Sequence, residues 1–356
     1  MSVSADRRQF RFSFSFIARA VLVVLVVWAL ANAVWVARDI LFIGFLAILF
    51  ALFLSIFVEM LERWMPRALA TVVVFLGVLV VVAGFFVLTW PSLEGQIVTV
   101  RRDVPRITEE VSEWVQTQIR SLAGSDLVEA DIREQLNQRM TSEVAGIVAG
   151  ALPLLNTVIG ALSGLLVVVF AGVFLAVAPR TYLKGTLALV PPRGRERLKG
   201  ALEEVAGGLR RWIGGMSVGM LVIFLFTTAG LWLLGVPAFL ALGIIAGLLV
   251  FIPFVGPVLS AIPAIALGLT VSPAMALWVA LLYVVVQLLE SNAITPMVMK
   301  RAVDLPPALT ILFQMAMAVL FGFIGLVVAV PLLAAARILV ERLYVDQLEA
   351  EDAAAR

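Results

Sequence analysis

The chain contains neither cysteine nor histidine among its 356 residues. The absence of cysteine excludes disulfides and thiolate chemistry, and the absence of histidine excludes imidazole metal ligands, imidazole proton relays and histidine-dependent triads. Proton-coupled chemistry must therefore use carboxylates. The sequence also lacks the G-x-x-x-x-G-K-[ST] pattern of a nucleotide-binding P-loop, so the chain cannot by itself be an ATP-driven pump of that type. We expect no enzyme activity and no cofactor.

Charged residues are scarce as well. They make up 14% of the chain, against roughly 25% in soluble domains, whereas 62% of the residues are hydrophobic. The mean hydropathy is +1.09. This composition predicts an integral membrane protein whose main partner is the lipid bilayer, and it does not support binding to nucleic acid.

Long apolar segments predict an all-α fold with about six transmembrane helices, since a helix needs roughly 20 apolar residues to cross a bilayer. The first five segments cover residues 12–37, 40–58, 68–90, 147–178 and 213–234. A sixth covers residues 274–289, after the helix-capping pair Ser272-Pro273.

Basic residues between the spans predict the orientation, because lysine and arginine favour cytoplasmic loops. Residues 180–211 carry eight basic and three acidic residues, whereas residues 91–148 carry six arginines and ten acidic residues. We therefore expect the loop 180–211 and both termini in the cytoplasm. The loop 91–148 is expected on the outer side.

The loop 91–148 has a helical pattern. Alternating three- and four-residue spacings link eight positions, all but one of them apolar: Ile97, Val100, Val104, Ile107, Val111, Trp114, Gln118 and Leu122. Such a heptad seam requires a packing partner. Gly124-Ser125-Asp126 predicts a helix end and a new start, so we expect a helical hairpin. It is either a packed antiparallel pair, or an oligomer contact or lid over a transport path.

Two later apolar runs contain helix breaks. Pro253, Gly256 and Pro257 interrupt residues 238–271, and Gly322 and Gly325 interrupt residues 308–340. Unpaired backbone groups are unfavourable in lipid, so a broken helix survives where protein buries it or where it lines a watery cavity. Each run splits into arms too short to span, which predicts two re-entrant hairpins of opposite entry side. Such pairs form transport sites near the membrane midplane.

A polar stretch lies between the two broken runs. Gln287, Glu290 and Asn292 mark the end of the span 274–289, and Thr295 follows. An ionisable group at membrane depth suggests function. Glu290 could carry protons or bind Na⁺ together with Asn292. The alternative is an interfacial carboxylate that only anchors the helix end.

These features divide the chain into five parts. They are the N-terminal transmembrane helices (1–90), the outer helical hairpin (91–148), a span with a basic cytoplasmic loop (149–211), the transport core (212–345) and a cytoplasmic tail (346–356).

The pattern from roughly residue 200 to residue 345 resembles the autoinducer-2 exporter family of bacterial membrane transporters. The residues that carry the resemblance are Phe251 to Pro257, Ile262-Pro263-Ala264, Gln287, Glu290, Asn292, Pro296, Pro306, Gly322, Gly325 and Pro331. The resemblance implies a multi-pass secondary transporter of the bacterial inner membrane. It also implies a homo-oligomer, with a pentamer among the implied forms. Some relatives are regarded as Na⁺(Li⁺)/H⁺ antiporters, so the family does not fix the substrate.

The leading interpretation is therefore an exporter of a small polar metabolite, such as autoinducer-2, coupled to a gradient of H⁺ or Na⁺. The predicted path residues are Pro253, Phe254, Gly256, Pro257, Gln287, Glu290, Asn292, Thr295, Gly322 and Gly325. A Na⁺(Li⁺)/H⁺ antiporter with ligands from Glu290 and Asn292 is one alternative. A membrane scaffold that recruits a partner through the outer hairpin is the other.

Overall fold

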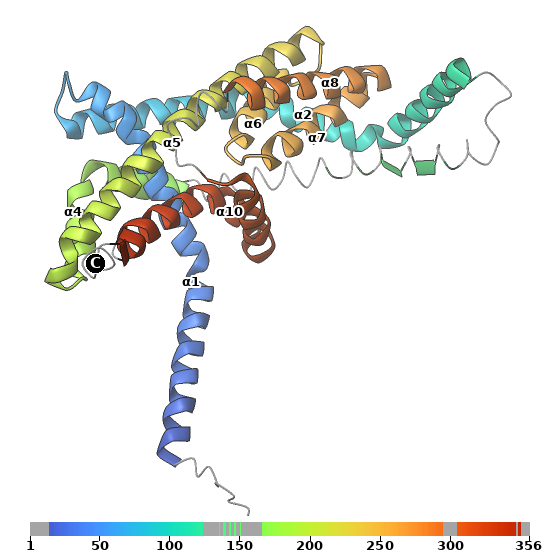
Figure 1. Cartoon of the computed structure of the whole chain (residues 1–356). Helices are drawn as coiled ribbons and strands as arrows, with labels where there is room; N and C mark the ends of the chain where they lie inside the picture. The colour runs from blue at the N-terminus through green and yellow to red at the C-terminus, as the bar shows by residue number, and fades with distance from the viewer. Residues whose placement is uncertain are drawn as a thin grey trace, which may run out of the picture.

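The computed structural model describes residues 14–123, 166–294 and 305–346, with a few single residues outside these ranges. All regular elements in this part of the chain are helices (Figure 1). Four of them are long and apolar enough to cross a membrane, and a bent pair of helices would add a fifth. The chain is therefore an all-α membrane protein. The total of about six spans stays a prediction.

The first helix, α1 (Phe14–Leu61), joins two predicted spans into one element. The sequence predicted a boundary near residues 38–39, and this prediction is wrong. Arg38 and Asp39 are instead consecutive residues of the helix, and Arg38 Nε lies 3.6 Å from Asp39 Oδ1. Residues 14–61 contain no proline, so no residue removes a backbone donor at this point. Figure 1 shows the N-terminal half of α1 extending away from the other helices.

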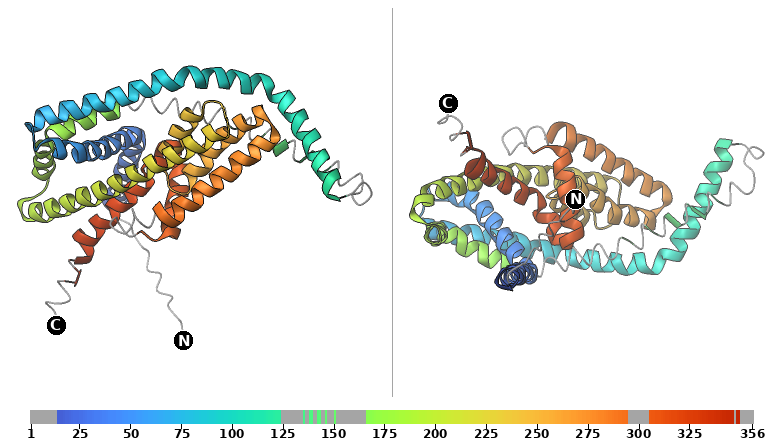
Figure 2. Two further views of the ribbon diagram at one scale, coloured as in Figure 1. Left: turned by 90° about the horizontal axis from the view of Figure 1, so that it is seen from above. Right: turned by 60° about the horizontal axis from the view of Figure 1, so that its bottom comes forward.

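The second helix, α2 (Arg67–Ala123), continues through the predicted boundary at residue 90. It is described as far as Ala123, so the helix end predicted at Gly124 and the partner helix predicted after Ser125 lie outside the described residues. Figure 2 shows α2 running along one side of the molecule. Ile107, Val111 and Val115 are buried in the main apolar core.

The packing partner of this seam lies within the same chain. The main core cluster that buries the seam residues of α2 also contains residues of α6 (Phe239–Leu249), α7 (Val255–Val271) and α8 (Pro273–Leu289). The N-terminal part of α2 belongs to a different cluster, with α1. The heptad pattern therefore marks the surface by which α2 covers the α6–α8 group.

A sharp bend precedes the longest helix of the C-terminal half. The helix Leu166–Val177 and α4 (Pro179–Ala188) meet at 88°. After a short turn, α5 (Pro192–Leu233) begins with a proline in its first turn. Proline is favoured there because the first backbone N–H groups of a helix have no intrahelical acceptor.

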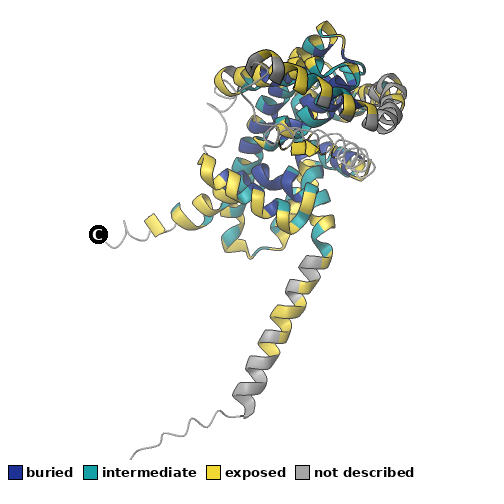
Figure 3. Cartoon of the chain, turned by 90° about the vertical axis from the view of Figure 1, so that its right-hand side faces the viewer, coloured by how far each residue is buried: buried dark blue, intermediate teal, exposed yellow. Residues whose placement is uncertain are grey.

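Glycines bring α5 and α6 into close contact. A Cβ atom at Gly243 would overlap the Thr228 hydroxyl, and one at Gly247 would lie 2.8 Å from the Met220 carbonyl oxygen. The four-residue spacing of Gly243 and Gly247 puts both on one face of α6, where small residues permit close helix approach. Figure 3 shows the buried residues gathered in the interior of the helix bundle, with exposed residues around them.

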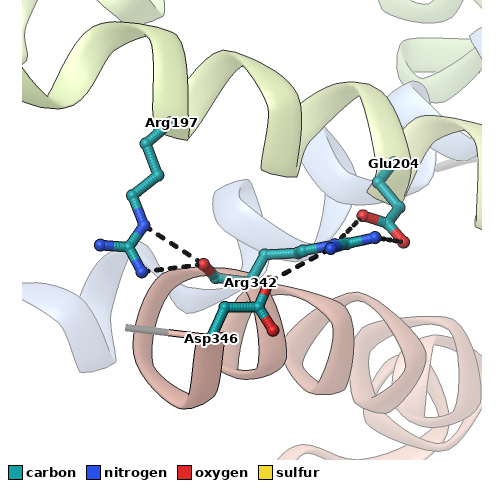
Figure 4. A network of polar contacts seen from close by, with 4 residues as sticks. All are labelled: Arg197, Glu204, Arg342 and Asp346. Atoms are coloured by element: carbon teal, nitrogen blue, oxygen red, sulfur yellow. Dashed lines mark hydrogen bonds and ion pairs between the residues drawn. The ribbon is translucent and has the colours of Figure 1, made fainter. Parts of the chain in front are cut away.

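The last long helix, α10 (Pro307–Val340), is followed by the short π-helix η2 (Glu341–Val345). Arg342 of η2 pairs with Glu204 of α5 and, at 3.1 Å, with Asp346 (Figure 4). Arg197 of α5 donates to the Arg342 carbonyl oxygen at 3.2 Å. These contacts fix the end of α10 to the N-terminal half of α5.

A second ion pair lies on the same half of α5, where Arg210 pairs with Glu59 of α1. We call the region of these two ion pairs the charged end of the helix bundle. The positive loop 180–211 belongs to it, so the expected orientation places the charged end on the cytoplasmic side.

The α5–α6 contact can be tested with Gly247→Ala. The added methyl group would meet backbone of α5, so we expect the free energy of unfolding to fall by about 1–3 kcal/mol. Thermal unfolding of the detergent-solubilised protein measures the change. Gly77→Ala is the matched control, because a Cβ at Gly77 meets nothing within 4 Å. Equal stability of the two variants would contradict close packing at Gly247.

Candidate functional site

The first predicted break is present between α6 and α7. Residues 250–254 form turns, and Phe254 has a positive φ of 67°. Pro257 lies in the first turn of α7, where its missing N–H removes no helical hydrogen bond. The two prolines therefore end one helix and start the next, as the sequence predicted.

The same spacing leaves the Pro253 carbonyl without a helical donor. Its donor in a continuous helix would be the N–H of residue 257, which proline lacks. The Pro253 oxygen accepts instead from the backbone N–H of Val255 at 2.8 Å and from Nε2 of Gln314 at 3.2 Å. Gln314 lies on the first arm of α10 and is 2% exposed. A buried amide thus links the first break to the other broken segment.

The second predicted break occurs at Gly322. Its φ of 65° and ψ of −148° interrupt α10, and this conformation is essentially confined to glycine. α10 therefore consists of two helical arms joined at a kink, which Figure 1 shows as a turn of its ribbon.

A glycine follows each break and permits the two arms to approach. A Cβ at Gly256 would overlap the carbonyl oxygen of Leu249, and one at Gly325 would overlap that of Met317. Both glycines are buried, and each faces the end of the arm that precedes its break. The two segments thus share a local design, although their sequences differ.

The two broken segments also pack against each other. Leu326, after the second break, belongs to one buried cluster with Leu249 and Ile252, next to the first break. Phe323 and Val255 pack against the same cluster. Together with the Gln314 contact, this places both breaks in one connected region. We call this region the hairpin overlap.

The first break lies near the charged end of α5. Phe251 stacks edge-on against Trp212, with ring centroids 5.2 Å apart, and Trp212 is two residues after Arg210. The stretch from Trp212 to Leu233 rises about 32 Å, which is close to the thickness of a bilayer core. The break is therefore closer to one end of the apolar part of α5 than to its middle. The expected site near the membrane midplane stays a prediction.

The second break lies beside α1. Phe321 stacks edge-on against Phe42, with ring centroids 4.9 Å apart. Met317 and Val328, on either side of Gly322, are buried in a cluster that Phe42 and Leu46 cover. Each break is thus held by an aromatic residue of a long helix, Trp212 for the first and Phe42 for the second.

The end of α8 lies level with the first break. α7 and α8 are antiparallel: a Cβ at Gly268 would approach Ala276, and the Tyr283 hydroxyl donates to the Ser260 carbonyl at 3.1 Å. Because the two helices are antiparallel, the end of α8 that carries Gln287 and Glu290 and the start of α7 lie at the same end of the pair, and the η1 turn (Glu290–Ile294) after α8 contacts α5. The predicted Ser272 cap of α8 is present and accepts from Met275 at 3.1 Å.

The polar end of α8 has its own local structure. Residues Glu290–Ile294 form a π-helix, η1, of a kind often found at functional sites. Gln287 Nε2 donates to Glu290 Oε2 at 3.0 Å, and Glu290 is half-buried. Asn292 is exposed, and its Nδ2 donates to the Leu288 carbonyl at 2.8 Å. The amide nitrogen of Asn292 therefore caps the helix end, and Thr295 lies outside the described residues.

Gln314 and Trp212 are the residues that the sequence analysis missed. Gln314 is the only amide in the apolar run 308–340, and a lone polar residue there is a signal of function or of backbone pairing. The sequence indicated a special role for Trp212 less clearly, because tryptophan is common at membrane interfaces. Its indole nitrogen is buried without a partner among the described residues.

Comparison with known proteins agrees with this architecture. The family model described as the AI-2E family transporter matches residues 22–344. The chain belongs to the AI-2E family of transporters. The resemblance that the broken runs suggested is therefore confirmed, and the match includes both broken hairpins and the polar end of α8. As a member of this family, the chain is a multi-pass membrane transport protein.

Relatives of this AI-2E family transporter are named as candidate transport proteins. YueF of Bacillus subtilis is 23% identical over 283 residues, covering 78% of this chain and 77% of YueF. A Thermotoga maritima protein is 25% identical over 293 residues, covering 80% of this chain and 82% of the relative. YrrI of Bacillus subtilis is 29% identical over 151 residues, which are 42% of this chain and 43% of YrrI. These names indicate a transport role for the relatives, and they name no substrate.

The Gln314–Pro253 contact can be tested with Gln314→Leu. This change keeps a similar side-chain volume but removes one of the two donors to the partly buried Pro253 carbonyl, so we expect the free energy of unfolding to fall by about 1–3 kcal/mol. Thermal unfolding in detergent measures the loss. Met315→Leu is the control at the neighbouring position, where the side chain is 61% exposed. If Gln314→Leu unfolds like the control, the amide does not support the break.

Proposed function

We propose that this AI-2E family transporter exports a small polar metabolite, such as autoinducer-2, across the bacterial inner membrane with the help of an ion gradient. The observation that carries the proposal is the hairpin overlap. Two broken helices meet there through the Gln314–Pro253 hydrogen bond and the cluster around Leu249, Ile252 and Leu326. Broken helices whose interrupted backbones meet are typical of substrate sites in secondary transporters.

The chemistry of the overlap suits an uncharged polar solute. The overlap offers a backbone carbonyl at Pro253 and the amide of Gln314. The end of α8 adds the amide of Gln287 and the carboxylate of Glu290. Hydroxyl groups of a polyol both donate and accept hydrogen bonds, so they match such a mixed set of groups. An aromatic pair, Trp212 and Phe251, supplies an apolar wall beside the break.

Glu290 is the proposed coupling residue. It is half-buried at the end of α8, and it accepts a hydrogen bond from the neutral amide of Gln287. A carboxylate in this position can exchange a proton or a Na⁺ ion with one side of the membrane. Movement of the ion and of the solute would then depend on the same small region.

A second candidate is a Na⁺(Li⁺)/H⁺ antiporter. The π-helix η1 presents the carboxylate of Glu290, the hydroxyl of Ser291 and the amide of Asn292 in consecutive residues, and Na⁺ prefers such oxygen ligands. The scaffold alternative has less support, because the seam residues Ile107 and Val111 are buried within their own chain. A homo-oligomer and cytoplasmic termini belong to the proposal as predictions.

The function is tested by Glu290→Gln in proteoliposomes loaded with autoinducer-2 under an imposed proton or sodium gradient. Loss of one charged contact corresponds to about 1.5–3 kcal/mol, so we expect the gradient-driven flux to fall at least about tenfold. Glu341→Gln is the control, since Glu341 is an exposed carboxylate on η2. Both variants should show the same elution profile in size-exclusion chromatography.

Three outcomes distinguish the candidates. Flux that collapses in Glu290→Gln and persists in Glu341→Gln supports metabolite export coupled through Glu290. Sodium-dependent proton movement without metabolite flux supports the antiporter. A Glu290→Gln variant with wild-type flux of both kinds would show that this carboxylate only anchors the helix end.

A further inference from the structure

A strongly basic surface lies apart from the hairpin overlap. It consists of α4, the turn after it and the first two turns of α5, residues 179–199, which we call the basic elbow. The elbow contains six basic residues and one acidic residue, Glu196. Nearly all of its side chains are exposed or half-exposed, and α4 contains no buried residue. A helix with no buried face gains little from the protein itself.

Some of the basic residues already have partners. Arg195 donates to the Val190 carbonyl at 2.9 Å, Lys199 lies 3.9 Å from Glu196, and Arg197 donates to the Arg342 carbonyl. These contacts hold the elbow in shape. Arg180, Lys184 and Arg193 are exposed and have no partner among the described residues.

The direction of α4 defines its environment. The helix Leu166–Val177, the end of a predicted span, meets α4 at 88°. If that helix crosses the bilayer, α4 lies close to parallel with the membrane surface. Tyr182 is 46% exposed and Leu189 is 87% exposed. Such side chains are unfavourable in water but suited to the headgroup region, where aromatic and apolar groups sit beside charged ones.

We propose that the basic elbow binds the headgroups of anionic phospholipids, through Arg180, Lys184 and Arg193. Phosphodiester groups complement these cations, and arginine can hold a phosphate with two parallel hydrogen bonds. Basic clusters beside membrane helices bind anionic lipid surfaces, with each cation adding about fivefold to the affinity. The elbow then anchors the charged end of α5 at the lipid–water boundary.

The absence of cysteine makes a direct test possible. In Thr186→Cys, an exposed position of α4, the introduced cysteine carries the only thiol-attached fluorophore. The protein is placed in phosphatidylcholine nanodiscs that contain spin-labelled phosphatidylglycerol or spin-labelled phosphatidylcholine. We expect severalfold stronger quenching by the anionic lipid, and we expect high salt to reduce the difference, because screening weakens exposed charge interactions.

The triple change of Arg180, Lys184 and Arg193 to glutamine should abolish the preference, so that the two spin-labelled lipids quench about equally. A matched variant changes Arg63, Arg211 and Arg337, three other exposed arginines, to glutamine. It should keep the preference. The proposal is overturned if the unmodified elbow shows equal quenching by both lipids, if the triple variant keeps its preference, or if the matched variant loses it equally. The readout is independent of transport, so a failure here leaves the proposed function untouched.

Discussion

The pairing of backbone polar groups in a low-dielectric membrane is the constraint on which the rest of this structure depends. Pro253 and Pro257 interrupt a helix where water is scarce, and the carbonyl of Pro253 must then find donors elsewhere. It finds them in Val255 and in the side chain of Gln314. The second donor lies on a different broken helix, so the pairing of one carbonyl also determines how two segments far apart in sequence are arranged.

Close helix packing makes this arrangement possible. Gly256 and Gly325 allow each arm to approach the backbone of its partner arm, and Gly243 and Gly247 bring α6 against α5. Between helices in a membrane, dispersion contacts of this kind replace the hydrophobic effect as the main stabilising interaction. The hairpin overlap is therefore a packed interior with a few polar groups, and the proposed transport chemistry must operate through those groups.

Much of this arrangement could be predicted from the sequence. Proline and glycine act through local backbone geometry, so both breaks and the cap at Ser272 were visible as patterns. The continuity of α1 could not be predicted. Charged residues at 38–39 suggest a membrane–water boundary when the tertiary contacts are unknown. The partner of the α2 seam and the role of Gln314 also depend on contacts between distant segments. A pattern shows that such residues need a partner, but it does not identify the partner.

The length of α2 has a practical consequence for imaging and for reconstitution. Its 57 residues correspond to a contour of about 85 Å, almost three times the thickness of a bilayer core. A detergent belt or a nanodisc can cover only part of such a rod. The particle is therefore asymmetric, and this helix provides a landmark by which the two faces of the molecule can be told apart even at low resolution.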